Sequence, residues 1–549
     1  MVEQDANGVP ATVATRGKVL VPEKLSKDGL EILQRAHDVH VDLSLDASGL
    51  LSVIGEYDAL IVRSATQVTR EVLEAGKKLK VIGRAGVGVD NIDLGAASER
   101  GVMVVNAPTG NCLAAAEHAV ALMCAMSRHI PAADASMKRG EWSRGKYVGV
   151  SLAHKTISII GFGRIGREVA KRARGLGMNV VAYDPFVSVE AGALVGVTIL
   201  ELDDALAAGD FITLHMPLLD STKNLLNRER LQLVKPTARI INAARGGIIE
   251  EEALLDALNS GALAGAALDC FSNEPTNKHP ESVSMKLAVH PNVVATPHLG
   301  ASTEEAQFDV AIEISESVVI ALNGGFAPTL VNAPAMRDDQ LKKVMPRARL
   351  AERLAKLAMV LNRTEHREVS SVSLEFHLRD ELEDTRMIKA FAIRGLLQDS
   401  SEIPINIVNA EKVAKSRNLV VQESKVPVGH DEDQYITVCV GSGHKIRGRT
   451  MGGLPHVTRI GVFETDLRLE GTLLVYIQED RPGQLGRSGK ILGDANVNVS
   501  NMTIGRHRDS DYSLAMVLLG VDSTPDAATL KALKESVCPE YTPVVVSFN

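Results

Sequence analysis

Three polar residues follow apolar runs in the middle of the chain: Arg245 after "INAA", Glu274 in "DCFSNEP" and His298 in "VVATPHLGAS". An arginine can hold a carboxylate through two parallel hydrogen bonds and polarise the carbonyl beside it. A histidine titrates near neutral pH and can accept a hydroxyl proton, and a neighbouring glutamate can fix the tautomer of its imidazole. Together these residue types predict a hydride-transfer site, with Arg245 binding substrate and Glu274 and His298 forming an acid–base pair.

A glycine-rich turn precedes the trio. Gly161, Gly163 and Gly166 stand in "IIGFGRIG", between an expected strand and an expected helix. Glycines there allow a tight turn and let a pyrophosphate approach the helix N-terminus. Asp184, in the following "VVAYDP", can accept hydrogen bonds from a ribose diol, and no Arg or Lys follows in "YDPFVSV" to hold a 2′-phosphate. The pattern predicts a dinucleotide site and favours NAD over NADP.

The elements that must position these residues alternate between short apolar runs and amphipathic stretches. One such series begins at Lys18, and a second begins at "KTISIIGFGRIG". This rhythm is typical of parallel strands joined by crossover helices. Ligands of doubly wound sheets bind beyond the carboxyl ends of the strands, so the trio should share one crevice. The two series predict an α/β protein with two doubly wound, Rossmann-like domains.

Two helical stretches are expected to connect the series. One covers roughly 114–139, and the other is "TEEAQFDVAIEISESVVIALNGG". If the second stretch carries the chain back, the first domain is built from both sides of the second. We therefore expect a discontinuous substrate domain at 17–115 and 299–332, and a dinucleotide-binding domain at 116–298.

Beyond these domains the pattern changes. From about 335 to 470 helices and strands mix without a catalytic motif, which indicates an α+β domain at 333–468. From Thr472 the expected order is βαββαβ, which is typical of a ferredoxin-like domain, here at 471–549.

Composition excludes several classes of function. The 60 Lys and Arg against 68 Asp and Glu give a net charge of −8, so no broad surface for nucleic acid or membrane is expected. The five cysteines are scattered, which favours reduced thiols over a disulfide framework or metal site. No apolar run is long enough to span a bilayer, and the start lacks an apolar signal core. We expect a cytoplasmic protein, and an organellar form with a removed transit peptide stays open.

The motifs "GFGRIG", "YDP", "NAARGGIIEEEAL", "AALDCFSNEP" and "PHLGAST" together resemble the D-2-hydroxyacid dehydrogenase family, and the resemblance runs from about residue 17 to the end. It implies that Arg245 binds and polarises substrate, and that Glu274 and His298 exchange the proton. The residues that it implies around NAD are Gly161, Gly163, Arg164, Ile165, Gly166, Asp184, Met216, Ala243, Arg245, Asp269, His298, Gly300 and Ala301.

Near the front, "ALIVRSATQVT", "VIGRAGVGVDNID" and "VNAPTGN" are similar to the branch of that family that acts on a phosphorylated substrate. The resemblance implies NAD-dependent oxidation of 3-phospho-D-glycerate to 3-phosphohydroxypyruvate, the first step of the phosphorylated route to L-serine. Arg63 and Arg84 would supply the additional positive charge that a phosphate needs. The implied substrate residues are Arg63, Ser64, Arg84, Asn111 and Arg245, with Trp142 and Arg144 lent across an interface of a homodimer or homotetramer.

The C-terminal segment "YIQEDRPGQLGRSGKILGDANVNV" resembles the start of an ACT domain, a small-molecule regulatory module. In serine-inhibited relatives the positions of Gln478, Asp480 and Asn498 bind serine. Gln478 departs from the His or Tyr found there, so L-serine is a hypothetical effector. The preceding domain resembles the allosteric substrate-binding domain of long family members. Its basic cluster is either an anion site or a solvated strand, and consists of His444, Lys445, Arg447 and Arg449.

Two other functions stay open at this point. Another D-2-hydroxyacid dehydrogenase or 2-oxoacid reductase would share the trio but would not need Arg63 and Arg84. A non-enzymatic NAD-sensing protein built on the same fold would not need the regulatory tail.

Overall fold

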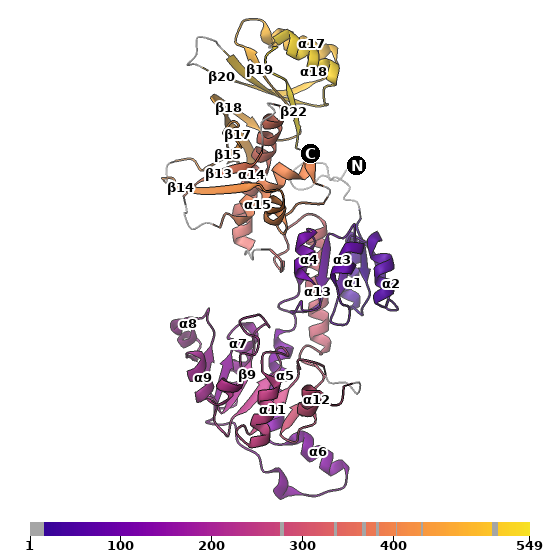
Figure 1. Cartoon of the computed structure of the whole chain (residues 1–549), viewed down its shortest axis with the longest axis vertical. Coiled ribbons are helices and arrows are strands. Elements are labelled where there is room, and N and C mark those ends of the chain that lie inside the picture. The colour runs from indigo at the N-terminus through magenta and orange to yellow at the C-terminus, as the bar shows by residue number, and fades with distance from the viewer. Residues whose placement is uncertain are drawn as a thin grey trace.

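The computed structural model describes residues 16–274, 279–333, 338–364, 369–379, 384–401, 403–429, 432–507, 514–537 and 539–548. Within these ranges the chain folds into four β-sheets with covering helices. Figure 1 shows the four units along the long axis, with the second at one end, the first in the middle and the two C-terminal units at the other end. Among the described helices, none combines the length and the apolar character needed to cross a bilayer.

The first sheet has five parallel strands in the order β2-β1-β3-β4-β5. They are β1 (Lys18–Val21), β2 (Asp38–Val41), β3 (Ala59–Val62), β4 (Val81–Arg84) and β5 (Met103–Asn106). Helices cover both faces, which is why the inner strands read as continuous apolar runs. One face packs against α2 (Ala47–Val53), α3 (Arg70–Ala75) and α4 (Leu94–Glu99), and the other against α1 (Lys27–Ala36) and α13 (Glu304–Leu322).

Helix α13 returns to the first sheet after the chain has completed the second one. Its residues Val310, Ile314 and Val318 lie in the core of the first unit. A Cβ atom on Gly83 of β4 would stand 2.7 Å from Cγ2 of Val318, so glycine allows this close seating. The first unit is discontinuous, as the sequence predicted.

The second sheet has seven parallel strands in the order β12-β11-β10-β9-β6-β7-β8. They are β6 (Thr156–Ile160), β7 (Asn179–Tyr183), β8 (Thr198–Ile199), β9 (Phe211–Leu214), β10 (Arg239–Asn242), β11 (Gly265–Leu268) and β12 (Val293–Ala295). The strand order reverses direction between β6 and β9, and such a switch point is where doubly wound sheets bind ligands. Both doubly wound sheets are confirmed.

The stretch predicted to be helical at 114–139 is helical apart from a short break, but it consists of two helices and not one. Helix α5 runs over Cys112–Ser127 and α6 over Ile130–Lys138. Between them His129 has φ 51, a left-handed conformation that does not continue an α-helix. Proline in the first turn of α6 is tolerated there.

The third unit is a six-stranded mixed sheet in the order β14-β13-β15-β16-β17-β18. Its elements are α14 (Asp338–Thr364), β13 (Ser371–Leu378), α15 (Arg386–Leu397), α16 (Ala410–Ser416), β14 (Val420–Pro427), β15 (Tyr435–Val440), β16 (Ile446–Met451), β17 (Leu454–Ile460) and β18 (Phe463–Arg468). The fourth unit is an antiparallel sheet in the order β20-β21-β19-β22, and its βαββαβ order confirms the prediction. Its elements are β19 (Thr472–Glu479), α17 (Gln484–Asp494), β20 (Val499–Arg506), β21 (Leu514–Val521), α18 (Ala527–Val537) and β22 (Val544–Ser547).

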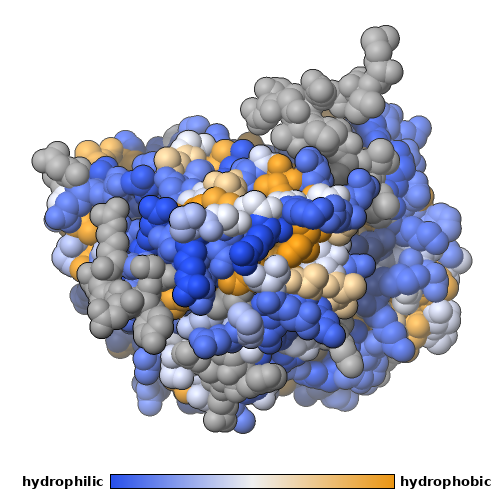
Figure 2. Space-filling view, turned by 90° about the horizontal axis from the view of Figure 1, so that it is seen from above, coloured by the Kyte–Doolittle hydropathy of each residue, from blue (hydrophilic) through white to orange (hydrophobic). Residues whose placement is uncertain are grey.

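The third and fourth units share one hydrophobic core. Leu474 and Tyr476 of β19 face α17 and α18. Their neighbours Leu473 and Val475 point to the opposite face and join the core of the third unit, together with Leu518 of β21. Strand alternation thus buries both faces of the fourth sheet. Figure 2 looks onto this end of the molecule and shows a mainly hydrophilic surface with small separate hydrophobic patches.

Candidate active site

The glycine-rich loop between β6 and α7 (Arg164–Gly175) leaves room on its outer side. A Cβ on Gly161, whose φ is 95, would stand 2.4 Å from the carbonyl oxygen of His215, and one on Gly166 would stand 2.3 Å from that of Gly161. A Cβ on Gly163 would have no neighbour within 4 Å. Two glycines therefore make the turn compact, and the third opens the helix N-terminus to a ligand.

Asp184 follows β7 and is tied to the same loop. Its Oδ2 accepts a hydrogen bond from the backbone N–H of Phe162 at 2.8 Å, and its Oδ1 accepts one from Phe186 at 2.9 Å. Each carboxylate oxygen can accept a further bond, so the half-exposed group stays available to a ribose diol. Of the other residues predicted to border NAD, Gly300 is buried, Arg164 is exposed, and Ile165, Met216, Ala243 and Ala301 are half-buried.

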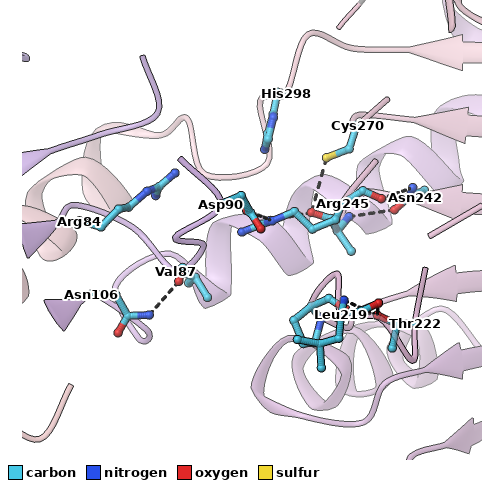
Figure 3. Close-up of polar contacts among 12 residues, drawn as sticks. Arg84, Val87, Asp90, Asn106, Leu219, Thr222, Asn242, Arg245, Cys270 and His298 are labelled. Atoms are coloured by element: carbon cyan, nitrogen blue, oxygen red, sulfur yellow. Dashed lines mark hydrogen bonds and ion pairs between the residues drawn. The ribbon is translucent and has the colours of Figure 1, made fainter. Parts of the chain in front are cut away.

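Arg245 follows β10 and contacts the first unit. Its Nε donates to Oδ2 of Asp90 at 2.9 Å, and its Nη1 donates to the carbonyl oxygen of Ala244 at 2.6 Å. Buried Asn242 holds the backbone here, because its amide donates to the carbonyl of Arg245. Asp90 lies in the loop after β4, so the carboxyl edges of the two parallel sheets meet at this pair. Figure 3 shows Arg84 and Arg245 extending from opposite sides of this junction, with His298 above.

Arg84 is a partly buried cation at the same junction. Burial, and after it the charge of Arg245, lowers the pKa of Arg84 to about 10, with a smaller lowering from Arg63. Asp90 and Glu23 act in the opposite direction. The Nε of Arg84 is buried and has no hydrogen-bond partner among the described residues. Arg63 and Arg84 thus lie at the ends of the neighbouring strands β3 and β4, and with Arg245 they form one positively charged cluster at the junction.

His298 and Glu274 lie side by side. The Nδ1 atom of His298 is 3.8 Å from Oε1 of Glu274, within ion-pair range and longer than a hydrogen bond. Both side chains are exposed, and His298 has φ 56. Because Nδ1 faces Glu274, Nε2 is the ring nitrogen left for a substrate.

A positioning residue that the sequence did not reveal is Glu251 of α11 (Glu251–Ser260). The side chain is buried; Oε1 accepts the backbone N–H of Ser272 at 2.5 Å and Oε2 accepts the hydroxyl of Ser284 at 2.5 Å. Glu251 therefore anchors the loop that carries Glu274. The only signal in the sequence was its place in the first turn.

The other predicted substrate residues do not all lie near the arginine cluster. Ser64 is exposed directly after Arg63. Asn111 occupies the N-cap position of α5 without a side-chain capping bond and is buried, with an Oδ1 that has no partner among the described residues. Trp142 and Arg144 are exposed, and they follow α6, which Figure 1 places at the end of the molecule away from the first unit. One chain does not bring these two residues to the junction.

The predicted effector residues lie at opposite ends of the fourth sheet. Gln478 pairs in register with Ala515 and through it with Arg506, whereas Thr472 pairs through Val521 with Val499. Asn498 precedes Val499, so it lies roughly 20 Å from Gln478 along the strands. The carboxylate of Asp480 pairs with Arg506 at 3.0 Å, and the amide of Asn498 donates to Asp522 at 2.7 Å. A single chain does not assemble the three into one site.

Most of the basic cluster at 444–449, which begins just before β16, is already partnered. Lys445 pairs with Glu375 at 3.1 Å, Arg449 pairs with Asp433, and the Arg447 guanidinium lies 5.0 Å from the ring centre of Tyr435. His444 is also engaged. The partners favour the interpretation as a basic strand over an anion site.

The described cysteines form no disulfides with one another. They are Cys112, Cys124, Cys270 and Cys439, and Cys538 lies outside the described residues. The described ranges hold no group of three or more His, Cys, Asp or Glu that could bind a metal ion.

The chain matches three protein families in sequence order. Residues 120–300 match the D-isomer specific 2-hydroxyacid dehydrogenase, NAD binding domain; residues 343–454 match the D-3-phosphoglycerate dehydrogenase intervening domain; and residues 471–537 match the ACT domain. These ranges correspond to the second, third and fourth units.

Relatives of known name cover almost the whole chain. It is 44% identical over 535 residues to D-3-phosphoglycerate dehydrogenase 3, chloroplastic, of Arabidopsis thaliana, a match that covers 94% of this chain and 90% of the relative. It is 40% identical over 505 residues to D-3-phosphoglycerate dehydrogenase of Synechocystis sp., with 90% and 88% covered. The crystal structure of D-lactate dehydrogenase from Aquifex aeolicus complexed with NAD and lactic acid is 26% identical with a TM-score of 0.51, and covers 56% of this chain and 96% of its own.

The chain thus has a glycine-rich loop, a carboxylate after β7 and polar residues at the strand ends. The Arabidopsis and Synechocystis relatives match 90% or more of its length, and both are named D-3-phosphoglycerate dehydrogenase. Together these findings show that the chain belongs to the D-3-phosphoglycerate dehydrogenase family and is an NAD-dependent dehydrogenase.

Proposed function

We propose that this chain oxidises 3-phospho-D-glycerate at C2 with NAD, giving 3-phosphohydroxypyruvate, the first step of the phosphorylated route to L-serine. The observation that carries the proposal is the cluster of Arg63, Arg84 and Arg245 at the junction of the two doubly wound units. A substrate with a carboxylate and a phosphate brings two anionic groups. Arg245 would hold the carboxylate, while Arg63 and Arg84 would hold the phosphate.

The loop after β6 fits a dinucleotide. Gly163 leaves its outer side open, the N-terminus of α7 offers backbone N–H groups to a pyrophosphate, and Asp184 can accept from a ribose diol. The carboxylate would repel a 2′-phosphate, so NAD is favoured over NADP. When bound, NAD supplies the acceptor for the hydride that leaves C2.

The proton of the C2 hydroxyl is assigned to Nε2 of His298. Glu274 lies beside the opposite nitrogen, where its carboxylate can favour the imidazolium that forms. Arg245 polarises the oxygen as it becomes a carbonyl. In the reverse direction His298 returns the proton.

We propose four functional domains. They are a substrate domain at 17–115 with 299–332, an NAD-binding domain at 116–298, an intervening domain at 333–468 and an ACT domain at 471–549. Because one chain brings neither Arg144 to the junction nor Asn498 to Gln478, both sites would be completed by another copy in a homodimer or homotetramer.

L-serine is the proposed effector of the ACT domain. The cytoplasm is the proposed compartment, with an organellar form as the alternative.

The test is NADH formation by the purified full chain with 3-phospho-D-glycerate, D-glycerate and D-lactate in parallel. We expect the phosphorylated substrate to have the highest kcat/KM, and Arg245→Ala to lose activity on all three. Arg63→Ala should raise KM for 3-phospho-D-glycerate far more than for D-glycerate. A preference for an unphosphorylated acid would favour another D-2-hydroxyacid dehydrogenase, and an inactive wild-type chain would favour an NAD-sensing protein.

A further inference from the structure

The side chain of Asp90 reaches from the first unit to an arginine of the second. It accepts a hydrogen bond from Nε of Arg245 at 2.9 Å, while the carbonyl of Ala244 accepts one from Nη1 at 2.6 Å. These two contacts lie on different edges of the guanidinium and fix its plane. They leave the N–H groups of Nη2 and one N–H of Nη1 for a ligand.

The backbone around Asp90 lies very close to two arginines of the cluster. A Cβ on Gly88 would stand 1.8 Å from Nη2 of Arg245, and one on Gly86 would stand 1.7 Å from Nη1 of Arg84. The loop therefore passes directly against both guanidiniums. The amide of Asn91 donates to the carbonyls of Arg63 at 2.8 Å and Thr66 at 2.6 Å, which ties the same loop to the third arginine.

The pair is poorly placed to stabilise the fold. The side chain of Asp90 is 58% exposed and that of Arg245 is 26% exposed. Ion pairs that are open to solvent typically contribute little to stability, because water and salt screen them. Its effect should instead be local, because Asp90 is a carboxylate among three arginines that otherwise repel one another.

We propose that Asp90 is the positioning residue of Arg245 and, together with Glu23, a resident counter-ion of the three-arginine cluster. It orients the guanidinium from across the junction, so that Arg245 meets the substrate carboxylate through its terminal nitrogens. It also offsets part of the positive charge of Arg63, Arg84 and Arg245 before an anionic substrate arrives. This inference rests on the proposed function, because it assigns a purpose to the same site.

The two roles are separated by two variants of the full chain. Asp90→Asn keeps an oxygen that can accept from Nε and removes the charge, whereas Asp90→Ala removes both. We expect kcat/KM for 3-phospho-D-glycerate to fall at least 30-fold in Asp90→Ala, mainly through kcat, and less than fivefold in Asp90→Asn. Inorganic phosphate should compete with the substrate at least threefold more strongly in Asp90→Asn than in the wild type. The Tm of both variants should stay close to that of the wild type.

A control variant removes one negative charge from the same unit at a position away from the cluster. Glu74→Gln removes an exposed carboxylate of α3 in the same unit, outside the cluster, and should change neither kcat/KM nor phosphate inhibition. Equal losses in Asp90→Ala and Asp90→Asn, with unchanged phosphate inhibition, would overturn the inference, and so would an Asp90→Ala protein with wild-type kinetics.

Direct titration of inorganic phosphate separates this inference from the proposed function. If the wild type does not turn over 3-phospho-D-glycerate, the proposed function fails. Calorimetric titration of the same proteins with phosphate should still show at least threefold tighter binding in Asp90→Asn. Equal affinities in the wild type and Asp90→Asn would contradict the counter-ion role by themselves.

Discussion

The backbone carbonyl of Asp269 accepts a hydrogen bond from the backbone N–H of His298 at 3.0 Å, and the carboxylate of Asp269 accepts two more from the residues that follow, Leu299 at 2.8 Å and Gly300 at 2.9 Å. Asp269 is only 1% exposed. The residue expected at the border of the cofactor thus has its carboxylate turned to the protein, where it holds the loop of the proposed base. His118 and Thr296 complete its surroundings.

Replacing Asp269 with Asn should destabilise the second unit in a pH-dependent way. Burial acts to raise the pKa of Asp269, but hydrogen bonds from His118, Thr296 and Leu299 outweigh it and hold the pKa below its usual value. A depressed pKa means that the ionised group stabilises the fold at neutral pH, and that this contribution is lost only as the pH falls below about 4. The Tm of Asp269→Asn should lie well below that of the wild type from pH 7 to pH 5. A difference that disappears already between these two values would contradict the assignment.

Gly88→Ala should impair the site without unfolding the protein. The added methyl would overlap Nη2 of Arg245, which is the end of a flexible side chain and can move away at small structural cost. We expect kcat/KM to fall at least 100-fold with a Tm close to that of the wild type. Gly175→Ala is the matched control, because a Cβ there would have no neighbour within 4 Å and the residue lies at the far end of α7 from the glycine-rich loop. A Gly88→Ala protein with unchanged kcat/KM would show that the position of Arg245 does not matter.

Cys270 should resist alkylation in the folded protein. It lies close to Arg245, is 5% exposed, and burial raises the pKa of its thiol to about 12. The thiolate is the reactive form, so almost none is present at pH 8. Peptide mapping after iodoacetamide treatment should find Cys270 unmodified in native protein and modified in denaturant. If iodoacetamide modified Cys270 in the folded protein as fast as it modifies an exposed thiol, Cys270 would not be buried with a raised pKa.

The third and fourth units should unfold together, because Leu518 belongs to the core of the third unit as well as to the fourth sheet. Leu518→Ala removes a fully buried side chain and should cost about 2–5 kcal/mol. Hydrogen exchange should then rise in α14 and in β21 alike. Loss of protection confined to 471–549 would show that the two units are independent.

The strand-end positions were predictable because local patterns determine them. Apolar runs predict parallel strands, and the carboxyl ends of such strands meet at one edge, so Arg245, Glu274 and His298 could be expected close together without coordinates. The glycine-rich loop with Asp184 was predictable for a similar reason, since the loop follows β6 and Asp184 follows the neighbouring strand β7 of one βαβ unit.

Contacts between distant segments were not predictable. Asp90 and Arg245 are 155 residues apart, and only the packing of one unit on the other makes them neighbours. The role of Glu251 depends on a loop that starts 21 residues later. Gln478 and Asn498 are close in sequence but lie at opposite ends of the sheet, because their strands are separated by β21 and its antiparallel register.

The central claim is that the arginine cluster selects a phosphorylated substrate, and Arg84→Met tests it most directly. The measurement is kcat/KM for 3-phospho-D-glycerate divided by that for D-glycerate, in the wild type and in the variant. We predict that the ratio falls at least tenfold, because methionine removes the buried cation with its unpaired Nε and leaves Arg245 and His298 in place. An unchanged ratio, with equal losses on both substrates, would contradict the account.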